Sequence, residues 1–325
     1  MNSQLAICIP TYNRATVLRD AFSHLIPIAS RFNVAIYVSD NASTDETLDV
    51  LESGRAQYPL VFFSRNAENI GMDANFEKAL SLSPARYAWL LGDDDRIHPD
   101  ALAEVLARIG NSNDQLLILN GGSANRSKGR VSGFHSRTFN DADQFLCTLG
   151  WHATWISGLV ISGQLIEKMN FSKYSGSYFS HFGSLFEALA TEKEVSIYWH
   201  DRSSFFPSSG AHFSWAPRIL EIFSDKWARV VESLPSRYSE NSKRTCIRAH
   251  SLHTGLFSIK ALLNFRAQGA ITRQAVIQHK QSLRLTSQTP LFIAQLICMI
   301  PVWLLRTPRR IYVSLRKLFS AAAPL

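Results

Sequence analysis

The sequence has few cysteines, and they do not cluster. Cys8, Cys147, Cys246 and Cys298 stand far apart and form no Cys-x-x-Cys pair. This spacing argues against a zinc site or a disulfide framework and is typical of a protein from a reducing cytosol. The first residues, MNSQLAICIPTYNR, also lack the basic stretch and long apolar run of a signal peptide. We therefore expect them to form the first strand of the fold.

Acidic residues are absent from the last part of the chain. All 26 Asp and Glu residues lie at or before Glu240, whereas residues 241–325 carry 13 of the 34 Lys and Arg residues. The first 240 residues thus hold 21 bases against 26 acids, a net charge of −5, and the rest has a net charge of +13. We expect an acidic body followed by a basic region that favours anionic partners.

The chain also lacks an apolar run long enough for a transmembrane helix, which needs about 20 residues. The most apolar segment near the C-terminus, 290–305, is interrupted by Pro301 and followed by basic residues among aromatics and leucines. This pattern predicts an interfacial amphipathic helix over 290–319 whose basic side chains reach anionic headgroups. A buried C-terminal helix with a solvated basic face is the alternative. Nucleic acid is disfavoured as a partner because no RNA-binding motif accompanies the charge.

Short apolar strands alternate with helices through the first 110 residues. Strands are predicted at 4–9, 34–40, 59–65 and 87–92, and helices at 17–25, 44–57, 73–83 and 99–109. This alternation predicts an α/β fold, Rossmann-like, with a mostly parallel sheet and helices on both faces. Later strands at 115–120, 155–162 and 194–201 and a helix at 178–192 precede helical patterns at 216–234, 243–265, 271–285 and 290–319. We therefore expect an α/β domain over 1–215 and a basic helical region over 216–325.

Polar segments follow each of the first four strands: PTYNR, SDNAS, RNAENIG and GDDD. In open α/β sheets the ligand crevice lies at the carboxyl ends of the strands. Adjacent carboxylates repel, and a divalent cation bound between them relieves the repulsion, so Asp93, Asp94 and Asp95 indicate a site for Mg²⁺ or Mn²⁺. Three aspartates alone are equally compatible with helix caps in a solvated loop.

The segments ICIPTYNR, VSDNASTDET, NIGMDANFEKAL and YAWLLGDDD together resemble glycosyltransferase family 2, the nucleotide-sugar-dependent transferases of GT-A fold. The resemblance is specific over 5–110, loose to about 215 and absent thereafter. It is greatest to enzymes that build bacterial surface polysaccharides such as O-antigen. It implies a metal-dependent, inverting transfer of one sugar from a nucleotide-sugar to a polyprenyl-diphosphate-linked saccharide. The place implied is the inner face of the cytoplasmic membrane, where a protein without a spanning helix would lie peripherally.

The resemblance also implies a role for each matching residue. The nucleotide pocket would be lined by Pro10, Thr11, Asn13, Arg14, Asn69, Gly71 and Asn75, with Asp40 and Asn41 facing the base and ribose. In the D-x-D motif, Asp95 would ligate the metal, Asp93 would meet the ribose or a metal-bound water, and Asp94 would join them at the nucleotide-sugar. Ala74 stands where many relatives carry an arginine, so Arg14 or a later basic residue would replace that diphosphate contact. Taken singly, these residues could be turn or cap residues.

The base of the reaction is less clearly marked. Relatives carry an acidic pair where this chain reads GSYFSHFGSLFEAL, which leaves His181 and Glu187 as candidates. A structural or acceptor-binding histidine is the alternative. His212 would supply a further metal ligand or face solvent. Trp151, Trp155 and Trp215 would stack on sugar rings or pack in the core.

Two other classes of function remain open on the sequence. A nucleotidyltransferase could use a similar α/β body with metal-binding aspartates, but it would release pyrophosphate. A catalytically silent sugar-binding or scaffold protein would show no metal-dependent affinity for nucleotides. The identities of the sugar, the nucleotide and the acceptor depend on pocket shape, which the motifs do not specify.

Overall fold

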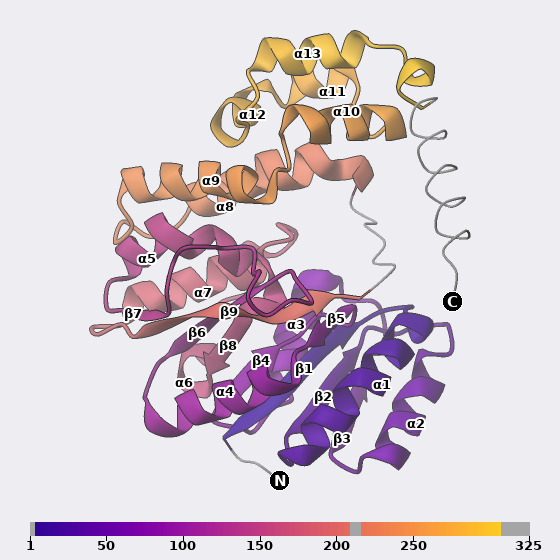
Figure 1. Cartoon of the computed structure of the whole chain (residues 1–325), viewed down its shortest axis with the longest axis vertical. Coiled ribbons are helices and arrows are strands. Elements are labelled where there is room, and N and C mark those ends of the chain that lie inside the picture. The colour runs from indigo at the N-terminus through magenta and orange to yellow at the C-terminus, as the bar shows by residue number, and fades with distance from the viewer. Residues whose placement is uncertain (1–3, 209–215, 307–325) are drawn as a thin grey trace. The chain divides into compact units, whose positions relative to one another are not determined.

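The computed structural model describes residues 4–208 and 216–306 (Figure 1). The chain divides into two compact units, Met1–Ala211 with Ser233–Cys246, and His212–Glu232 with Ile247–Leu325. Residues 233–246 thus belong with the first unit although they follow the start of the second in sequence. A functional boundary at residue 215 stays a prediction.

The first unit is built on a nine-stranded sheet in the order β3-β2-β1-β4-β8-β6-β9-β5, with β7 paired to β9. The strands are β1 (Leu5–Thr11), β2 (Ala35–Asp40), β3 (Val61–Arg65), β4 (Tyr87–Leu90), β5 (Asp95–Ile97), β6 (Leu116–Gly121), β7 (Arg137–Phe139), β8 (Leu159–Ser162) and β9 (Ile197–Pro207). Neighbours among β1 to β4 pair in parallel, as do β6 and β9, whereas β8 runs antiparallel between β4 and β6. The predicted mostly parallel sheet is confirmed, and β5 and β7 are additions that the sequence patterns did not indicate.

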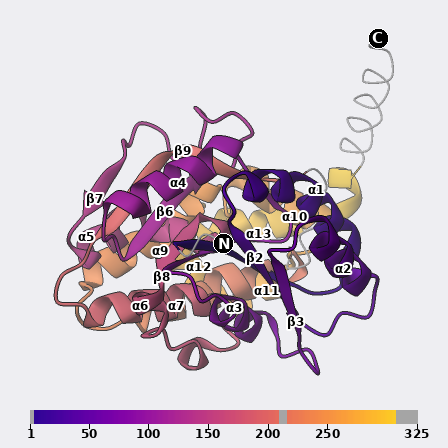
Figure 2. The same ribbon diagram turned by 90° about the horizontal axis from the view of Figure 1, so that it is seen from below.

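Helices cover both faces of this sheet, which explains why β1 and β2 are buried along their whole lengths and largely apolar before their polar carboxyl ends. The helices are α1 (Ala15–Arg31), α2 (Thr47–Gln57), α3 (Met72–Ser81), α4 (Pro99–Asn111), α5 (Ala142–Leu149), α6 (Gly163–Ile166) and α7 (Ser180–Thr191). Helix α1 packs against α2 and α4, while α7 packs against α3 and α6 on the opposite face (Figure 2). Buried Leu18, Phe22 and Leu25 recur every three or four residues along α1, which gives that helix one apolar face.

The second unit is helical. Its elements are η4 (Ala216–Arg218), the π-helix η5 (Glu221–Lys226), α8 (Trp227–Glu232), the second half of α9 (Glu240–Thr254), α10 (Ile259–Gln268), α11 (Arg273–Gln278), α12 (Lys280–Thr286) and α13 (Leu291–Met299). Buried Phe257, Leu262, Val276 and Ile297 contribute to its own apolar core. No helix in the described part of the chain is both long and apolar enough to cross a bilayer.

Three predicted helix boundaries in this region were wrong. The helix expected over 243–265 is two helices, because Gly255 adopts a φ of 69° and ends the regular hydrogen bonding. The helix expected over 271–285 is interrupted at His279, which separates α11 from α12. The helix expected over 290–319 is interrupted after Met299, at Pro301, and helical structure resumes over 302–306; residues after 306 lie outside the described part.

Two helical glycines provide a matched test of packing in the first unit. A Cβ at Gly54 in α2 would lie 2.5 Å from a ring carbon of Phe22, whereas one at Gly110 in α4 would meet nothing within 4 Å. We expect Gly54→Ala to lower the free energy of unfolding by about 1–3 kcal/mol through overpacking. Gly110→Ala should instead raise it by up to about 1 kcal/mol, because alanine favours helix. Urea unfolding of the full chain measures both, and equal effects would contradict the packing of α1 on α2.

Candidate functional site

The candidate site lies where the strand order reverses, between β1 and β4. Connections lead outward from these two neighbours in opposite directions, which leaves a crevice at their carboxyl ends. Thr11 ends β1 and pairs in register with Asp40, which ends β2. Gly92 and the three aspartates directly follow β4 and Leu91. The sheet therefore brings together the polar ends that the sequence predicted to be neighbours.

Arg14 joins the start of α1 to the first two aspartates. Its Nη1 donates to Asp93 Oδ1 at 2.5 Å and its Nη2 to Asp94 Oδ2 at 2.8 Å. The Thr11 hydroxyl donates to the other Asp93 oxygen at 2.7 Å. Asp93 is buried, whereas the side chains of Arg14 and Asp94 are about one-third exposed, at 30% and 28%. A single guanidinium thus partly neutralises two carboxylates at the crevice.

Asp95 points to a different set of partners. Its Oδ2 accepts from Trp155 Nε1 at 2.9 Å and from the Ser157 hydroxyl at 2.5 Å. The same Ser157 oxygen accepts from the backbone N–H of Gly92 at 2.9 Å. These contacts come from the short helix η2 (Ile156–Gly158) and the residue before it. They fix the Asp95 carboxylate through donors other than Arg14.

Burial leaves these carboxylates short of compensating charge. Desolvation raises the pKa of Asp93 to about 6, against the opposing charge of Arg14 and with a further upward push from Asp94. Desolvation likewise raises the pKa of Asp95 to about 6, opposed by the hydrogen bond from Ser157. A bound cation would stabilise both carboxylates in their charged form.

The donor set fits a divalent cation that is shared with a substrate. In the described ranges, 4–208 and 216–306, no three His, Cys, Asp or Glu side chains converge as a preformed metal cage. Mg²⁺ is commonly held by only one or two carboxylates together with substrate phosphates. Asp95, rigidly held by neutral donors, is the carboxylate best suited to that role, because no cation already pairs with it.

Asp40 and Asn41 support the neighbouring loop at the end of β2. Asp40 is fully buried, accepts from the Ser43 backbone N–H at 3.0 Å, and has its second oxygen 3.5 Å from Arg65 Nε. Asn41 Oδ1 accepts from the backbone N–H of residue 70 at 2.9 Å, and its Nδ2 donates to Asn69 Oδ1 at 2.9 Å. These bonds hold the loop before α3 against the sheet edge.

That loop turns at Gly71, whose φ of 84° lies in the region that glycine alone adopts freely. The Asn69 side chain accepts from the Gly71 backbone N–H at 2.9 Å. Asn69 is exposed and Asn41 is almost fully buried. Direct contact of Asp40, Asn41, Asn69 or Gly71 with a nucleotide stays a prediction.

The remaining predicted pocket residues differ in exposure. Asn75 is buried, accepts from the Ser39 hydroxyl at 2.7 Å and donates to the Ser39 carbonyl at 3.2 Å, so it ties α3 to β2. Pro10 is buried within β1. Asn13 is exposed, with a φ of 50°, and its Oδ1 accepts from the Thr44 backbone N–H at 2.7 Å. Asn13 is therefore the more accessible to a ligand, whereas the Asn75 amide is already bonded within the protein.

His181 lies in the first turn of α7 and is buried, with 2% of its surface exposed. Its Nε2 is 3.2 Å from the Thr154 carbonyl, and its Nδ1 has no hydrogen-bond partner among the described residues. The ring packs edge-on against Phe76, at 5.4 Å between centroids. Desolvation lowers its pKa to about 4, although the charge of Asp73 opposes the shift. The imidazole is therefore neutral at pH 7.

Glu187 has a different environment. Its Oε1 pairs with Lys173 Nζ at 2.6 Å.

The tryptophans considered as sugar-stacking residues differ in burial. Trp151 is 1% exposed and packs in the core, whereas Trp155 is partly exposed and donates to Asp95. His212 and Trp215 lie outside the described residues.

Sequence reasoning missed two residues that shape the site. Ser157 lies in WISGLVIS, which the sequence pattern predicts to be a strand, and nothing in that segment marks its hydroxyl as a partner of Asp95. Asp73 caps the start of α7 by accepting from the backbone N–H groups of residue 178 at 3.2 Å and Ser180 at 3.4 Å. Because these partners are more than 60 residues apart in sequence, local pattern gives no signal for either role.

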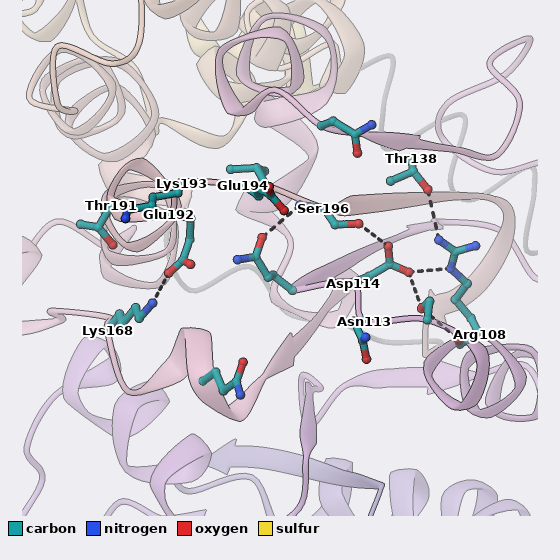
Figure 3. Close-up of a pocket in the computed structure, with 15 residues that line it drawn as sticks. Arg108, Asn113, Asp114, Thr138, Lys168, Thr191, Glu192, Lys193, Glu194 and Ser196 are labelled. Atoms are coloured by element: carbon teal, nitrogen blue, oxygen red, sulfur yellow. Dashed lines mark hydrogen bonds and ion pairs between the residues drawn. The ribbon is translucent and has the colours of Figure 1, made fainter.

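A polar cavity of about 1290 Å³ lies at the opposite edge of the sheet (Figure 3). It adjoins the amino ends of β6 and β9, and several of its charged side chains are bonded to one another. Asp114 accepts from Arg108 Nε and from the Ser196 hydroxyl, each at 2.6 Å, and Lys168 pairs with Glu192. The strand-end rule therefore favours the aspartate edge over this cavity as the ligand site.

Solved structures share this architecture. TarS 1–349 from S. aureus superposes with a TM-score of 0.54 at 15% identity, covering 91% of this chain and 90% of that one. The mannosyltransferase PcManGT from Pyrobaculum calidifontis, in complex with GDP-Man and Mn²⁺, gives a TM-score of 0.51 at 14% identity, covering 96% and 88%. These likenesses and the strand order confirm the GT-A fold with its helical C-terminal region.

Sequence comparison points to the same class of protein. Residues 6–161 match the model described as Glycosyl transferase family 2. Over 102 residues the chain is 38% identical to abequosyltransferase RfbV of Salmonella typhimurium. The aligned segment covers only 30% of this chain and 30% of that relative.

The buried imidazole of His181 predicts a pH dependence of stability. Its pKa near 4 in the folded protein lies below the unfolded value of about 6.5, so the unfolded state binds more protons and stability falls as pH drops through this window. Between pH 7 and pH 5 protonation of this residue should lower the free energy of unfolding by roughly 2 kcal/mol. His181→Gln keeps a neutral donor that does not titrate in this range. The free energy of unfolding of the wild type relative to that of the variant should therefore fall by the same amount between pH 7 and pH 5. Urea unfolding at both pH values measures it, and a pH-independent difference would contradict the depressed pKa.

Proposed function

We propose that this protein is a metal-dependent, inverting glycosyltransferase that moves one sugar from a nucleotide-sugar to a lipid-linked saccharide in surface-polysaccharide biosynthesis. The observation that carries the proposal is the gathering of Thr11, Arg14 and the three aspartates at the point where the strand order reverses. The family match of residues 6–161 and the activity named for RfbV support the same class of reaction.

The donor half of the proposal rests on charge and exposure. Asp95 would hold Mn²⁺ or Mg²⁺, and Asp93 with Asp94 would meet the nucleotide-sugar beside it. When bound, the cation would stabilise the negative charge of the departing nucleoside diphosphate. Solved relatives of this fold hold GDP-Man with Mn²⁺ in one case and UDP-GlcNAc in another, which supports a nucleotide-sugar donor without naming the one used here.

The base would act on the acceptor hydroxyl from the side opposite the diphosphate. We favour His181 over Glu187, because the His181 ring is neutral and its Nδ1 lone pair is not hydrogen-bonded within the described residues. Glu187 is already paired with Lys173. Because 2% of His181 is exposed, an acceptor would need to open the contact with Phe76 to reach it. A lowered pKa also weakens the base, so its contribution to rate should be modest.

The acceptor half of the proposal rests on the second unit. Phe292, Leu296 and Met299 are 62%, 57% and 62% exposed along one face of α13, while Ala294 and Ile297 on the other side pack in the core of that unit. Trp303 follows, at 68% exposed. With 13 basic and no acidic residues in 241–325, this apolar face suits an anionic lipid surface. A polyprenyl-diphosphate-linked acceptor would be presented there, at the inner face of the cytoplasmic membrane.

Asp95 provides the test of the metal site. Asp95→Asn preserves the acceptor oxygen for Trp155 and Ser157 and should leave the fold intact, but it removes the charge that binds the metal. We expect sugar transfer to fall on the order of a hundredfold or more, and Mn²⁺-dependent thermal stabilisation by nucleotide-sugars to disappear. Exposed Asp100 in α4 provides the control, since Asp100→Asn removes a charge away from the crevice.

A screen of UDP-, GDP-, CDP- and dTDP-sugars against the wild type would identify the donor for this test. Full activity of Asp95→Asn would refute the metal assignment. Release of pyrophosphate from a nucleoside triphosphate would indicate a nucleotidyltransferase instead. No metal-dependent nucleotide binding by the wild type would indicate a scaffold or sugar-binding protein.

The apolar face of α13 provides the test of the membrane surface. Replacing both Phe292 and Leu296 by Gln should weaken binding to phosphatidylglycerol-containing vesicles roughly tenfold or more, because each side chain contributes about 1.5–3 kcal/mol when buried. The matched control replaces Leu252 and Ile259, which are 56% and 50% exposed in α9 and α10. Binding should also weaken with salt and require anionic lipid. Equal losses in both variants, or unchanged vesicle binding, would contradict this surface assignment.

A further inference from the structure

Arg130 presents a charged group beside the candidate site that forms no ion pair with a carboxylate of the described residues. Its guanidinium carbon lies 4.2 Å from the centroid of the Trp155 ring. The residue is exposed, and among the described residues its side chain forms no hydrogen bond or ion pair. Arg14 differs, because both of its terminal nitrogens already bind aspartates. Arg130 is thus a cation whose donors remain available to a ligand.

The backbone holds Arg130 firmly over this ring. The Arg130 backbone N–H donates to the Gly121 carbonyl at 2.8 Å. The buried amide of Asn120 donates to the Val131 carbonyl at 2.8 Å and accepts from the Val131 backbone N–H at 3.2 Å. A Cβ at Gly129 would lie 2.2 Å from Asn120 Nδ2, so only glycine allows the loop to approach so closely. The loop after β6 is therefore anchored on both sides of Arg130.

Trp155 connects Arg130 to the aspartates. The indole carries the guanidinium over its ring and donates through Nε1 to Asp95 at 2.9 Å. Phe205 packs edge-on against the indole at 4.7 Å between centroids, which limits its rotation. Desolvation lowers the pKa of Arg130 and the Asp95 carboxylate raises it, so the two charges lie within electrostatic reach of each other. The cation and the carboxylate thus border the same part of the crevice.

The chemistry of this arrangement selects a phosphate. A planar guanidinium that stacks on an aromatic ring keeps its edge N–H groups free to bind two oxygens of one anion. Neutral sugar hydroxyls would gain little from that charge, whereas a phosphate shared with a cation at Asp95 would gain from both. Helix α3 also carries Ala74, and no basic side chain, in the position before Asn75. Because Arg14 is already bonded to Asp93 and Asp94, Arg130 is the better placed of these two arginines to bind a phosphate near Asp95.

We propose that Arg130, stacked on Trp155, binds a phosphate group of a substrate next to Asp95. This inference rests on the proposed function, since it assumes that a phosphate-bearing substrate enters the crevice. Two substrates of that reaction carry such a group, the nucleotide-sugar donor and the polyprenyl-diphosphate acceptor. The shared chemistry is a diphosphate, and the experiment below distinguishes the two sources.

The test compares Arg130→Gln with Arg130→Lys and with Lys128→Gln in the full chain. Lys128 is an exposed basic residue of the same loop, so its variant loses the same unit of charge without the stacked position. Dissociation constants are measured by calorimetry with Mn²⁺ for UDP, GDP, CDP and dTDP, and separately for farnesyl diphosphate as a soluble polyprenyl diphosphate. Uridine, guanosine, cytidine and thymidine serve as probes without phosphate. Unfolding curves establish that each variant is folded.

We expect Arg130→Gln to weaken binding of the preferred nucleoside diphosphate on the order of tenfold or more, with binding of its nucleoside and that of farnesyl diphosphate unchanged. Arg130→Lys should lie between Arg130→Gln and wild type, because it retains charge without the planar fork. A loss confined to farnesyl diphosphate would assign the same contact to the acceptor.

Unchanged affinity for both diphosphates, or an equal loss in Lys128→Gln, would overturn the proposal. If either of these results is found but the wild type binds nucleoside diphosphates with Mn²⁺, the proposed function still stands. A wild type that binds none of them would refute the proposed function itself, so the two failures are distinguishable.

Discussion

The bridge from Arg14 to Asp93 and Asp94 is the interaction on which the candidate site depends. It joins the beginning of α1 to the segment after β4, so the two strands that flank the crevice are linked through one side chain. Without that cation, two neighbouring carboxylates would lie side by side, with the Thr11 hydroxyl as the remaining side-chain donor to them among the described residues. Because the guanidinium is shared, each carboxylate is only partly neutralised and remains able to bind a further positive group.

The site separates rigid support from groups that remain available to a ligand. Asn41 and Asn75 are buried, and their amides bond the adjoining loop and strands, which keeps the edge of the sheet ordered. Asp95 is fixed by Trp155 and Ser157, both neutral donors. Neutral donors orient a carboxylate without cancelling its charge. An Arg in their place would have held Asp95 equally well but reduced its attraction for a cation.

Much of this arrangement could be predicted from sequence because it follows from local pattern. Apolar runs that end in PTYNR, SDNAS and GDDD identify parallel strands, and parallel strands bring their carboxyl ends to one edge. The exposed apolar side of α13 is visible as the spacing of Phe292, Leu296 and Met299. The break at Gly255 was missed because the helical pattern continues on both sides of it, and only the observed φ of 69° reveals where the helix ends.

The sequence by itself determined the sheet edge, its acidic character and the division into an acidic body and a basic C-terminal region, since each depends on residue order and composition. Tertiary structure decided which groups face that edge. The antiparallel insertion of β8 next to β4 brings Trp155 and Ser157 to Asp95, and the loop after β6 brings Arg130 over the same indole. It also buried His181 and thereby lowered its pKa. These effects come from residues distant in sequence, and their strength depends on how the chain excludes water, which no local pattern records.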